Sequence, residues 1–135
     1  MEDVPDHECA LFHFQELARS NDAEGEFQRI HSVRSLASEE LPLIQSPGCV
    51  RSLVLGEQMI SKFNETSRNT VRIFMAVIRL PAVTTDIVIS FNAPTHIASS
   101  SSSAPNVSEL SHDDISKVFE DFLRSFCIQQ WSLFC

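Results

Sequence analysis

Residues 71–94, VRIFMAVIRLPAVTTDIVISFNAP, show the clearest hydrophobic pattern of the chain, because two apolar runs meet at Pro81. We place a four-residue loop at 81–84, which brings the two runs together as an antiparallel hairpin. This register sets opposite charges and two aromatic rings directly across from each other, and such cross-strand pairs favour it. The predicted pairs are Leu80–Thr85, Arg79–Asp86, Ile78–Ile87 and Phe74–Phe91.

Both faces of this hairpin are apolar. The pattern places on one face Phe74, Ala76, Ile78, Leu80, Ile87, Ile89 and Phe91, and on the other Ile73, Met75, Val77 and Val88. A strand pair without a polar face has to be covered on both sides. We therefore expect the hairpin to be the central part of a sheet that lies between two other layers.

A second pattern, near the C-terminus, predicts an amphipathic helix over residues 111–126. Ser111 and Asp114 have the spacing of a capping box, and acidic residues follow at the positive end of the helix. The apolar side consists of Ile115, Val118, Phe119, Phe122, Leu123 and Phe126, while Lys117, Glu120, Asp121 and Arg124 face water. We expect the apolar side to cover one face of the sheet, so that Phe122→Ala costs about 3–5 kcal/mol.

The remaining segments give weaker patterns, which we interpret from local alternation and from turn-forming residues. Alternation predicts two strands, at 26–36 and 49–63. Turn-forming and serine-rich sequences predict irregular segments at 41–48, 64–69 and 98–108, the last a flexible loop. A short strand followed by a helical turn is expected around Leu11, Phe12 and Phe14. The final residues are expected to be extended and packed by Ile128, Trp131 and Phe134.

The composition of the 135 residues, 43% hydrophobic and 21% charged, is that of one globular domain. The formal net charge is −8, and the Lys/Arg footprint with which proteins bind nucleic acid is absent. An acidic surface favours a basic protein partner, or serves solubility alone.

No apolar run reaches the roughly 18 residues that span a membrane, and the acidic N-terminus is unlike a signal peptide. With four scattered cysteines and no C-x-x-C, we expect an intracellular protein with free thiols.

The sequence contains no familiar signature of catalysis or cofactor binding. Phosphate-binding, nucleophile and zinc-protease motifs do not occur, and three glycines leave little for a phosphate cradle. His7, Cys9 and His13 match no usual zinc spacing, so we expect no metal and no cofactor. Asp113 and Asp114 are explained more simply by the helix N-terminus than as paired catalytic carboxylates. These observations favour a protein-binding role without enzyme activity.

Three stretches resemble the Ran guanine nucleotide release factor family, which shares its fold with the PsbP-like proteins. They are CVRSLVLGEQMISKFN (49–64), NTVRIFMAVIRLPAVTTDIVISFNAP (69–94) and WSLF (131–134). The specific parts are G-x-Q, at Gly56 and Gln58, and IRLP with TDIVISFN across the hairpin. FHFQELA and FQRIHSV upstream are similar too, so the resemblance covers nearly the whole chain. It implies an α+β fold, an antiparallel sheet sandwiched by helices of the PsbP-like α/β/α type, in a single domain over 1–135.

The resemblance also implies a function. Members of this family are non-enzymatic regulators that bind the small GTPase Ran, promote guanine nucleotide release and affect nucleocytoplasmic transport. The chain is then expected to be a monomer in nucleus and cytoplasm, without nucleic acid or membrane partners. Acidic side chains suit such a role, because they pair with lysines near a nucleotide site. The candidate partner-binding residues are Glu2, Asp3, Asp6, Glu8 and Glu16, whereas Asp86 is assigned a structural role opposite Arg79.

One feature departs from the family. Its members usually begin earlier, with a β-hairpin, an acidic segment and a helix, whereas this chain begins just before EDVPDHECA. We therefore expect an N-terminally shortened form that starts near the end of that helix. Such a form could expose a sheet edge and lose Ran activity. Two further alternatives stay open: a PsbP-like adaptor with a non-Ran partner, and a small hydrolase that uses Cys9 or Cys127 with a histidine.

Overall fold

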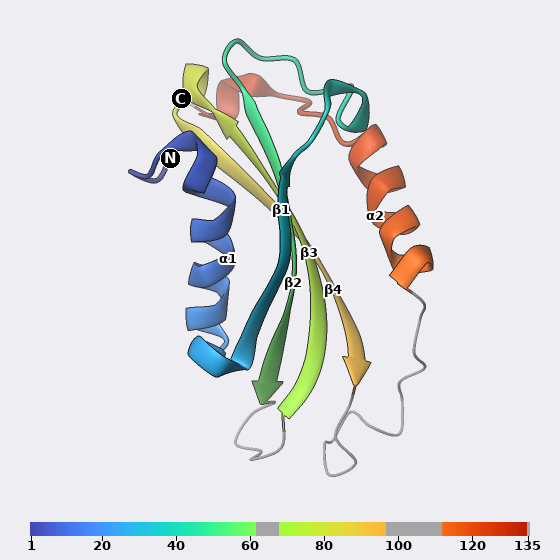
Figure 1. The fold of residues 1–135 in the computed structure, drawn as a ribbon. Helices are drawn as coiled ribbons and strands as arrows, with labels where there is room; N and C mark the ends of the chain where they lie inside the picture. Colours follow the sequence, from blue (N-terminus) through green and yellow to red (C-terminus); the bar gives the residue numbers. More distant parts are fainter. Residues whose placement is uncertain (62–67, 97–111, 135) are drawn as a thin grey trace.

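The computed structural model describes residues 1–61, 68–96 and 112–134, and its strands form one antiparallel sheet with a helix on each face (Figure 1). The strands, in their order across the sheet, are β1 (Gln28–Ser35), β2 (Val50–Ser61), β3 (Arg68–Leu80) and β4 (Thr85–His96). Helix α1 (Cys9–Ser20) covers one face, and helix α2 (His112–Ser125) covers the other. The expected α+β class, with the sheet sandwiched by helices, is confirmed.

The hairpin of β3 and β4 has the predicted register. Its loop is a single 3-10 turn at Pro81–Val83, and Thr84 closes it in the left-handed region with φ 48°. All the predicted pairs are present: Leu80–Thr85, Arg79–Asp86, Ile78–Ile87 and Phe74–Phe91. The face that carries Phe74 and Ile78 packs in one cluster with the buried residues of α2, as expected.

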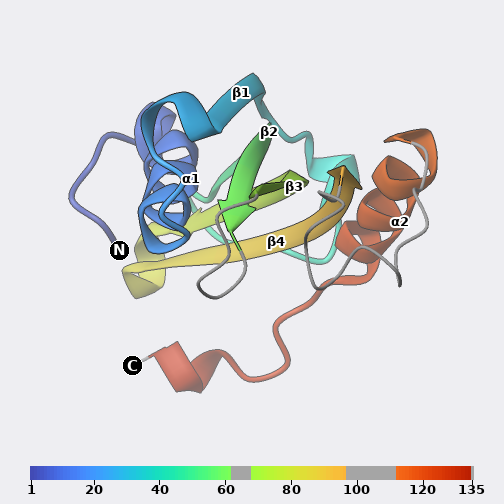
Figure 2. The same ribbon diagram turned by 90° about the horizontal axis from the view of Figure 1, so that it is seen from below.

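The hairpin as a whole is not central in the sheet, and this corrects the expectation. Of the two strands of the hairpin, only β3 has a neighbour on each side, while β4 is an outer strand of the described sheet (Figure 2). On the α1 side, Ile73, Met75 and Val77 of β3 are buried. Helix α1 packs mainly on β1, β2 and β3, so Val88 of β4 stays 40% exposed. An apolar pattern in a strand therefore did not mean that both of its faces are covered.

Helix α2 buries only one of its two apolar stripes. Ile115, Phe119 and Leu123, spaced four residues apart, are buried in the core. Val118 and Phe122 lie on the neighbouring stripe and are 55% and 50% exposed. Successive stripes of a helix point in different directions, and the second stripe here reaches the outer strand β4, where the sheet ends. The expected burial of Phe122 is therefore wrong, and the large cost of removing its ring, which was expected on the condition of that burial, loses its basis.

The N-terminal strand expected at Leu11–Phe14 is also wrong, because these residues belong to α1. Alternation over four residues favours a strand locally, but burial here follows helical spacing. The buried positions are Cys9, Ala10, Phe14 and Ala18. The expectation that the chain starts near the end of a helix is wrong as well, since α1 is a full helix of 12 residues that follows residues 1–8.

The G-x-Q sequence of β2 positions this helix on the sheet. A Cβ atom at Gly56 would lie 2.6 Å from both the Phe14 ring and the Arg29 carbonyl oxygen, so only glycine lets the ring pack there. Gln58 is fully buried; its Nε2 donates to the Phe14 carbonyl at 3.4 Å, and its Oε1 accepts from Asn21 at 2.9 Å. Both residues of the motif therefore have structural roles beneath α1.

The other predicted segments have mixed outcomes. The strands at 26–36 and 49–63 are confirmed as β1 and β2, although β1 is shorter than predicted and residues 62–63 lie outside the described residues. The loop at 41–48 is present, with Leu41 and Ile44 buried. Ile128 packs on the core as expected, but residues Trp131–Phe134 form a 3-10 turn instead of an extended segment. Ser111, the serine-rich loop 98–108 and most of the turn at 64–69 lie outside the described residues. Within the described ranges, no helix is long and apolar enough to cross a membrane.

Candidate partner-binding surface

A buried guanidinium group organises one end of the molecule, beside the turn between β3 and β4. Arg79 is 2% exposed, and Asp86 accepts two hydrogen bonds from it, at 2.9 and 3.0 Å. The remaining N–H groups donate to the carbonyl oxygens of Val4 (2.5 Å) and Glu2 (3.0 Å) and to the Asp6 carboxylate (3.2 Å). Because an arginine has five N–H groups, every donor is used, and Arg79 ties the N-terminal segment to the hairpin.

Asp86 is the main acceptor of this network, and its side chain is only 3% exposed. Burial acts to raise its pKa, but hydrogen bonds from Arg79, from His13 and from the Glu2 amide lower the pKa of Asp86 to about 2. The hydrogen bond to Asp86 is also the main cause that raises the pKa of Arg79. His13 Nε2 lies 3.0 Å from the Asp86 carboxylate, so α1 joins the same network. The structural role predicted for this pair is confirmed.

Four of the five candidate acidic residues lie in the segment that this network holds. Glu2, Asp3, Asp6 and Glu8 are all exposed, and they occupy the residues immediately before α1. Of these, Asp6 directs its carboxylate to Arg79 while its side chain stays 61% exposed. The structure therefore presents a short acidic segment, residues 2–8, on a rigid support.

Glu16 lies apart from this segment. It is on α1, about 12 Å further along the helix axis than Glu8. Its carboxylate oxygen is 2.6 Å from the Arg19 guanidinium, one helical turn away, and the Glu16 side chain is 42% exposed. Glu16 is therefore partly neutralised, and the structure does not bring it together with the other four.

The sequence identified the Arg79–Asp86 pair but missed the attachment of residues 2–6 to Arg79. Two of the three contacts are made to backbone carbonyl groups, which every residue type carries, so no side-chain pattern marks them. One signal was present: an arginine in an otherwise apolar, buried strand needs more acceptors than a single aspartate supplies. That requirement points to a further chain segment at this position.

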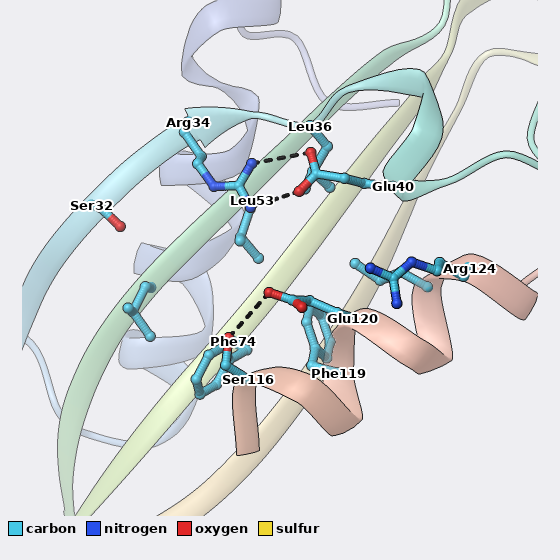
Figure 3. A pocket seen from close by; sticks show the side chains of 12 residues that line it. Ser32, Arg34, Leu36, Glu40, Leu53, Phe74, Ser116, Phe119, Glu120 and Arg124 are labelled. Atoms are coloured by element: carbon cyan, nitrogen blue, oxygen red, sulfur yellow. Dashed lines mark hydrogen bonds and ion pairs between the residues drawn. The ribbon is translucent and has the colours of Figure 1, made fainter. Parts of the chain in front are cut away.

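A separate hollow of about 260 Å³ lies between α2 and the strands (Figure 3). Its apolar lining includes Leu36, Leu53, Leu55, Phe74, Phe119 and Leu123. Arg34 and Glu40 pair across its upper part through two hydrogen bonds, at 2.8 and 3.1 Å, and this pairing lowers the pKa of Glu40. Glu120 and Arg124 come from α2. Two cations and two anions balance, so the lining favours neither an anionic nor a cationic ligand.

The residues considered for metal binding or catalysis do not form a site. His7 is 80% exposed, Cys9 is fully buried, and His13 is engaged with Asp86. Burial is the main cause that raises the pKa of the Cys9 thiol, which disfavours the reactive thiolate. In the part of the chain that the structure describes, no group of three or more His, Cys, Asp or Glu could hold a metal ion. Asp113 and Asp114 are exposed in the first turn of α2, and Cys127 is exposed after it.

The fold and this surface define a small α+β protein whose exposed chemistry is an acidic segment fixed to a β-hairpin. The family model described as "Ran-interacting Mog1 protein" matches residues 1–94. The chain therefore belongs to the Mog1 family of Ran-interacting proteins, and the resemblance found in the sequence is confirmed.

Curated relatives agree with this assignment. A probable Ran guanine nucleotide release factor of Dictyostelium discoideum is 35% identical over 126 residues, which are 90% of this chain and 64% of the relative. The Ran guanine nucleotide release factor of Danio rerio is 37% identical over 102 residues, 75% of this chain and 55% of the relative. The protein of the same name from Bos taurus is 29% identical over 93 residues, 67% and 47% respectively. The chain thus spans about half to two thirds of the length of the relatives it matches.

Proposed function

We propose that this chain binds the small GTPase Ran and promotes release of its guanine nucleotide, without catalysing a covalent reaction itself. The observation that carries the proposal is the match of residues 1–94 to the Ran-interacting family, since these residues include the acidic segment and the hairpin that anchors it. The relatives are named as release factors, which supports binding over catalysis. The expected consequence is an effect on nucleocytoplasmic transport, exerted by a monomer present in nucleus and cytoplasm.

The mechanism follows from thermodynamic linkage. A partner that binds nucleotide-free Ran more tightly than nucleotide-bound Ran must lower the affinity of Ran for its nucleotide by the same factor. Acidic side chains suit this task, because they attract lysines that otherwise contact phosphates and they repel the phosphates themselves. No bond has to be made or broken by the regulator.

The contact surface in this proposal is formed by Glu2, Asp3, Asp6 and Glu8, with Glu16 at its margin. The Arg79 hydrogen bonds to the backbone of Glu2 and Val4 hold the segment in place before any partner arrives. A preorganised segment loses less conformational entropy on binding than a free tail, which supports its use as a contact surface.

The test is the release of fluorescent GDP from Ran in the presence of increasing concentrations of the chain. The release rate is expected to rise and to saturate. The triple variant Glu2→Lys/Asp3→Lys/Glu8→Lys leaves the Asp6–Arg79 contact intact and is expected to reduce the acceleration about tenfold or more.

The matched control carries the same change in charge at three exposed acidic residues elsewhere, Glu24→Lys/Glu26→Lys/Glu39→Lys. This control is expected to keep most of the activity. The proposal would be wrong for this chain if it neither accelerated GDP release nor bound nucleotide-free Ran in calorimetry. An equal loss in both triple variants would mean that total charge, not this segment, is responsible.

A further inference from the structure

The two outer strands of the described sheet differ in how their edges are protected. β1 carries Arg29, His31 and Arg34, and its register with β2 is interrupted between Ile30 and Ser32. Charges and irregularities of this kind prevent another strand from pairing with an edge. Residues 87–93 of β4, IVISFNA, contain neither a charge nor a proline, and their register with β3 is continuous. In the described sheet β4 pairs only with β3, so no described strand occupies its other edge.

The β4 edge is apolar on its α2 side, whereas on its α1 side the polar residues Ser90 and Asn92 are exposed next to Val88. On the α2 side, a groove of about 130 Å³ runs between β4 and the helix, lined by Ile89, Ser90, Phe91, Val118, Phe119 and Phe122. On the α1 side, Val88 is 40% exposed because α1 does not reach this strand. Figure 2 shows the C-terminal tail beyond this edge, and the described tail residues do not pair with β4.

The charges beside the groove are negative. Helical geometry, at 100° per residue, makes Asp114 and Asp121 the charged residues nearest to the Val118–Phe122 stripe, with Lys117, four residues before Asp121, one step further round the helix. Both aspartates are exposed, and the whole chain has a net charge of −8. Asp121 also pairs with Arg124 at 3.0 Å, but both side chains are more than half exposed, so the pair screens the carboxylate only in part.

We propose that the β4 edge and the β4–α2 groove bind an extended apolar segment of a partner protein that is flanked by lysines or arginines. This edge supplies backbone hydrogen bonds for an added strand, and the groove accepts alternate apolar side chains. The acidic neighbours select basic flanking residues. A second copy of the chain is disfavoured as the occupant, because two molecules of charge −8 repel each other. This surface does not depend on the proposed Ran contact, which lies on residues 2–8.

The test uses the peptide KKTVTVTVKK and the isotopically labelled full chain in NMR titrations. Saturable shifts are expected for backbone amides of residues 87–93 and 118–126, and not for β1. The same peptide N-methylated at every valine and threonine cannot donate backbone hydrogen bonds, and it is expected to bind about tenfold more weakly or less. EETVTVTVEE is expected to bind more weakly than the lysine peptide at low salt.

Matched variants distinguish specific binding in the β4–α2 groove from nonspecific hydrophobic binding elsewhere on the surface. Phe122→Ser, at a half-exposed position, is expected to weaken binding about tenfold, whereas Val33→Ser on the exposed, protected edge strand β1 is expected to leave it unchanged. Circular dichroism checks that both variants fold. The proposal would be overturned if the plain and N-methylated peptides bound with equal affinity. It would also be overturned if the Phe122→Ser variant bound the peptide as tightly as the parent chain. If sedimentation showed concentration-dependent dimers and the NMR signals of β4 shifted with concentration, the occupant of the edge would be a second copy of the chain. If the peptide bound only after deletion of residues 98–108, the occupant would be that segment of the chain itself.

Discussion

At the scale of single residues, the Arg79–Asp86 pair is the interaction on which the candidate surface depends. Both side chains are nearly inaccessible, and Arg79 also holds the backbone of residues 2–4. Removing the Asp86 charge leaves the buried Arg79 with only two carbonyl groups and the largely exposed Asp6 carboxylate as acceptors. Asp86→Asn is therefore expected to lower the free energy of unfolding at neutral pH by about 3 kcal/mol, measured by urea denaturation.

The pH dependence of stability provides a second test of the same carboxylate. The pKa of Asp86 is about 2 in the folded chain, below its ordinary value of 3.8, so its ionised form stabilises the fold above pH 4. This contribution, about 2 kcal/mol, is lost as the pH falls through 4 towards 2. Urea denaturation between pH 6 and pH 2.5 is expected to show a smaller loss for Asp86→Asn than for the parent chain. Identical pH profiles would mean that Asp86 is not ionised in the fold as described.

The charge pair was predictable from the sequence, while its surroundings were not. A register that sets Arg79 opposite Asp86 follows from counting residues across the loop, and the structure confirms it. The contacts of Arg79 with the carbonyl groups of Glu2 and Val4 cannot be predicted from residue types, because every residue has a backbone carbonyl group. The participation of His13 depends on where α1 lies, which a local pattern does not fix.

At the scale of elements, α2 shows that helical periodicity does not decide which stripe is buried. Phe119 is 3% exposed and its ring lies near those of Phe74 and Phe91, whereas Phe122 is 50% exposed and its ring lies near that of Phe126. Phe119→Ala is expected to cost about 3–5 kcal/mol of unfolding free energy, because it opens a cavity in the core.

Phe122→Ala, in the same helix, is the matched comparison. Since half of its ring is already in contact with water, the expected cost is only about 1 kcal/mol. Thermal and urea denaturation of the two variants measure the difference directly. Similar losses in both would show that the second stripe of α2 is covered in solution and that the groove beside β4 is closed.

The predictions for whole elements succeeded where long-range pattern and register agreed. The β3–β4 hairpin and α2 each extend over more than ten residues with one consistent period, so local ambiguity averages out. The segment around Phe14 was too short for this, and its helix packs against Gly56 of β2, a contact that the local pattern does not contain. The position of β4 at the edge depends on which other strands exist, and the pattern within β4 contains no such information.

At the scale of the whole molecule, charge and hydrophobicity are separated in space. The acidic segment of residues 2–8 is fixed beside the β3–β4 turn, whereas the apolar stripe of α2 borders β4 on the opposite face of the sheet (Figure 1). Such a division suits two different partners. A partner of the first surface is attracted mainly by charge, from a distance, whereas a partner of the second is held mainly by short-range contacts, with charge acting only on its flanking residues. The two surfaces should therefore respond differently to salt.

This difference gives the last prediction, which rests on the proposed binding of Ran. Exposed charges act mainly on the association rate and are screened by salt, because the Debye length falls from about 14 Å at 0.05 M to about 4 Å at 0.5 M ionic strength. The association rate with nucleotide-free Ran, measured by stopped-flow fluorescence, is expected to fall about tenfold over this range, with little change in dissociation. The Glu2→Lys/Asp3→Lys/Glu8→Lys variant should show a distinctly shallower salt dependence than the control reversed at Glu24, Glu26 and Glu39. Equal slopes in the two variants would place the Ran contact away from residues 2–8, because a surface that steers its partner must lose that effect when its own charges are reversed.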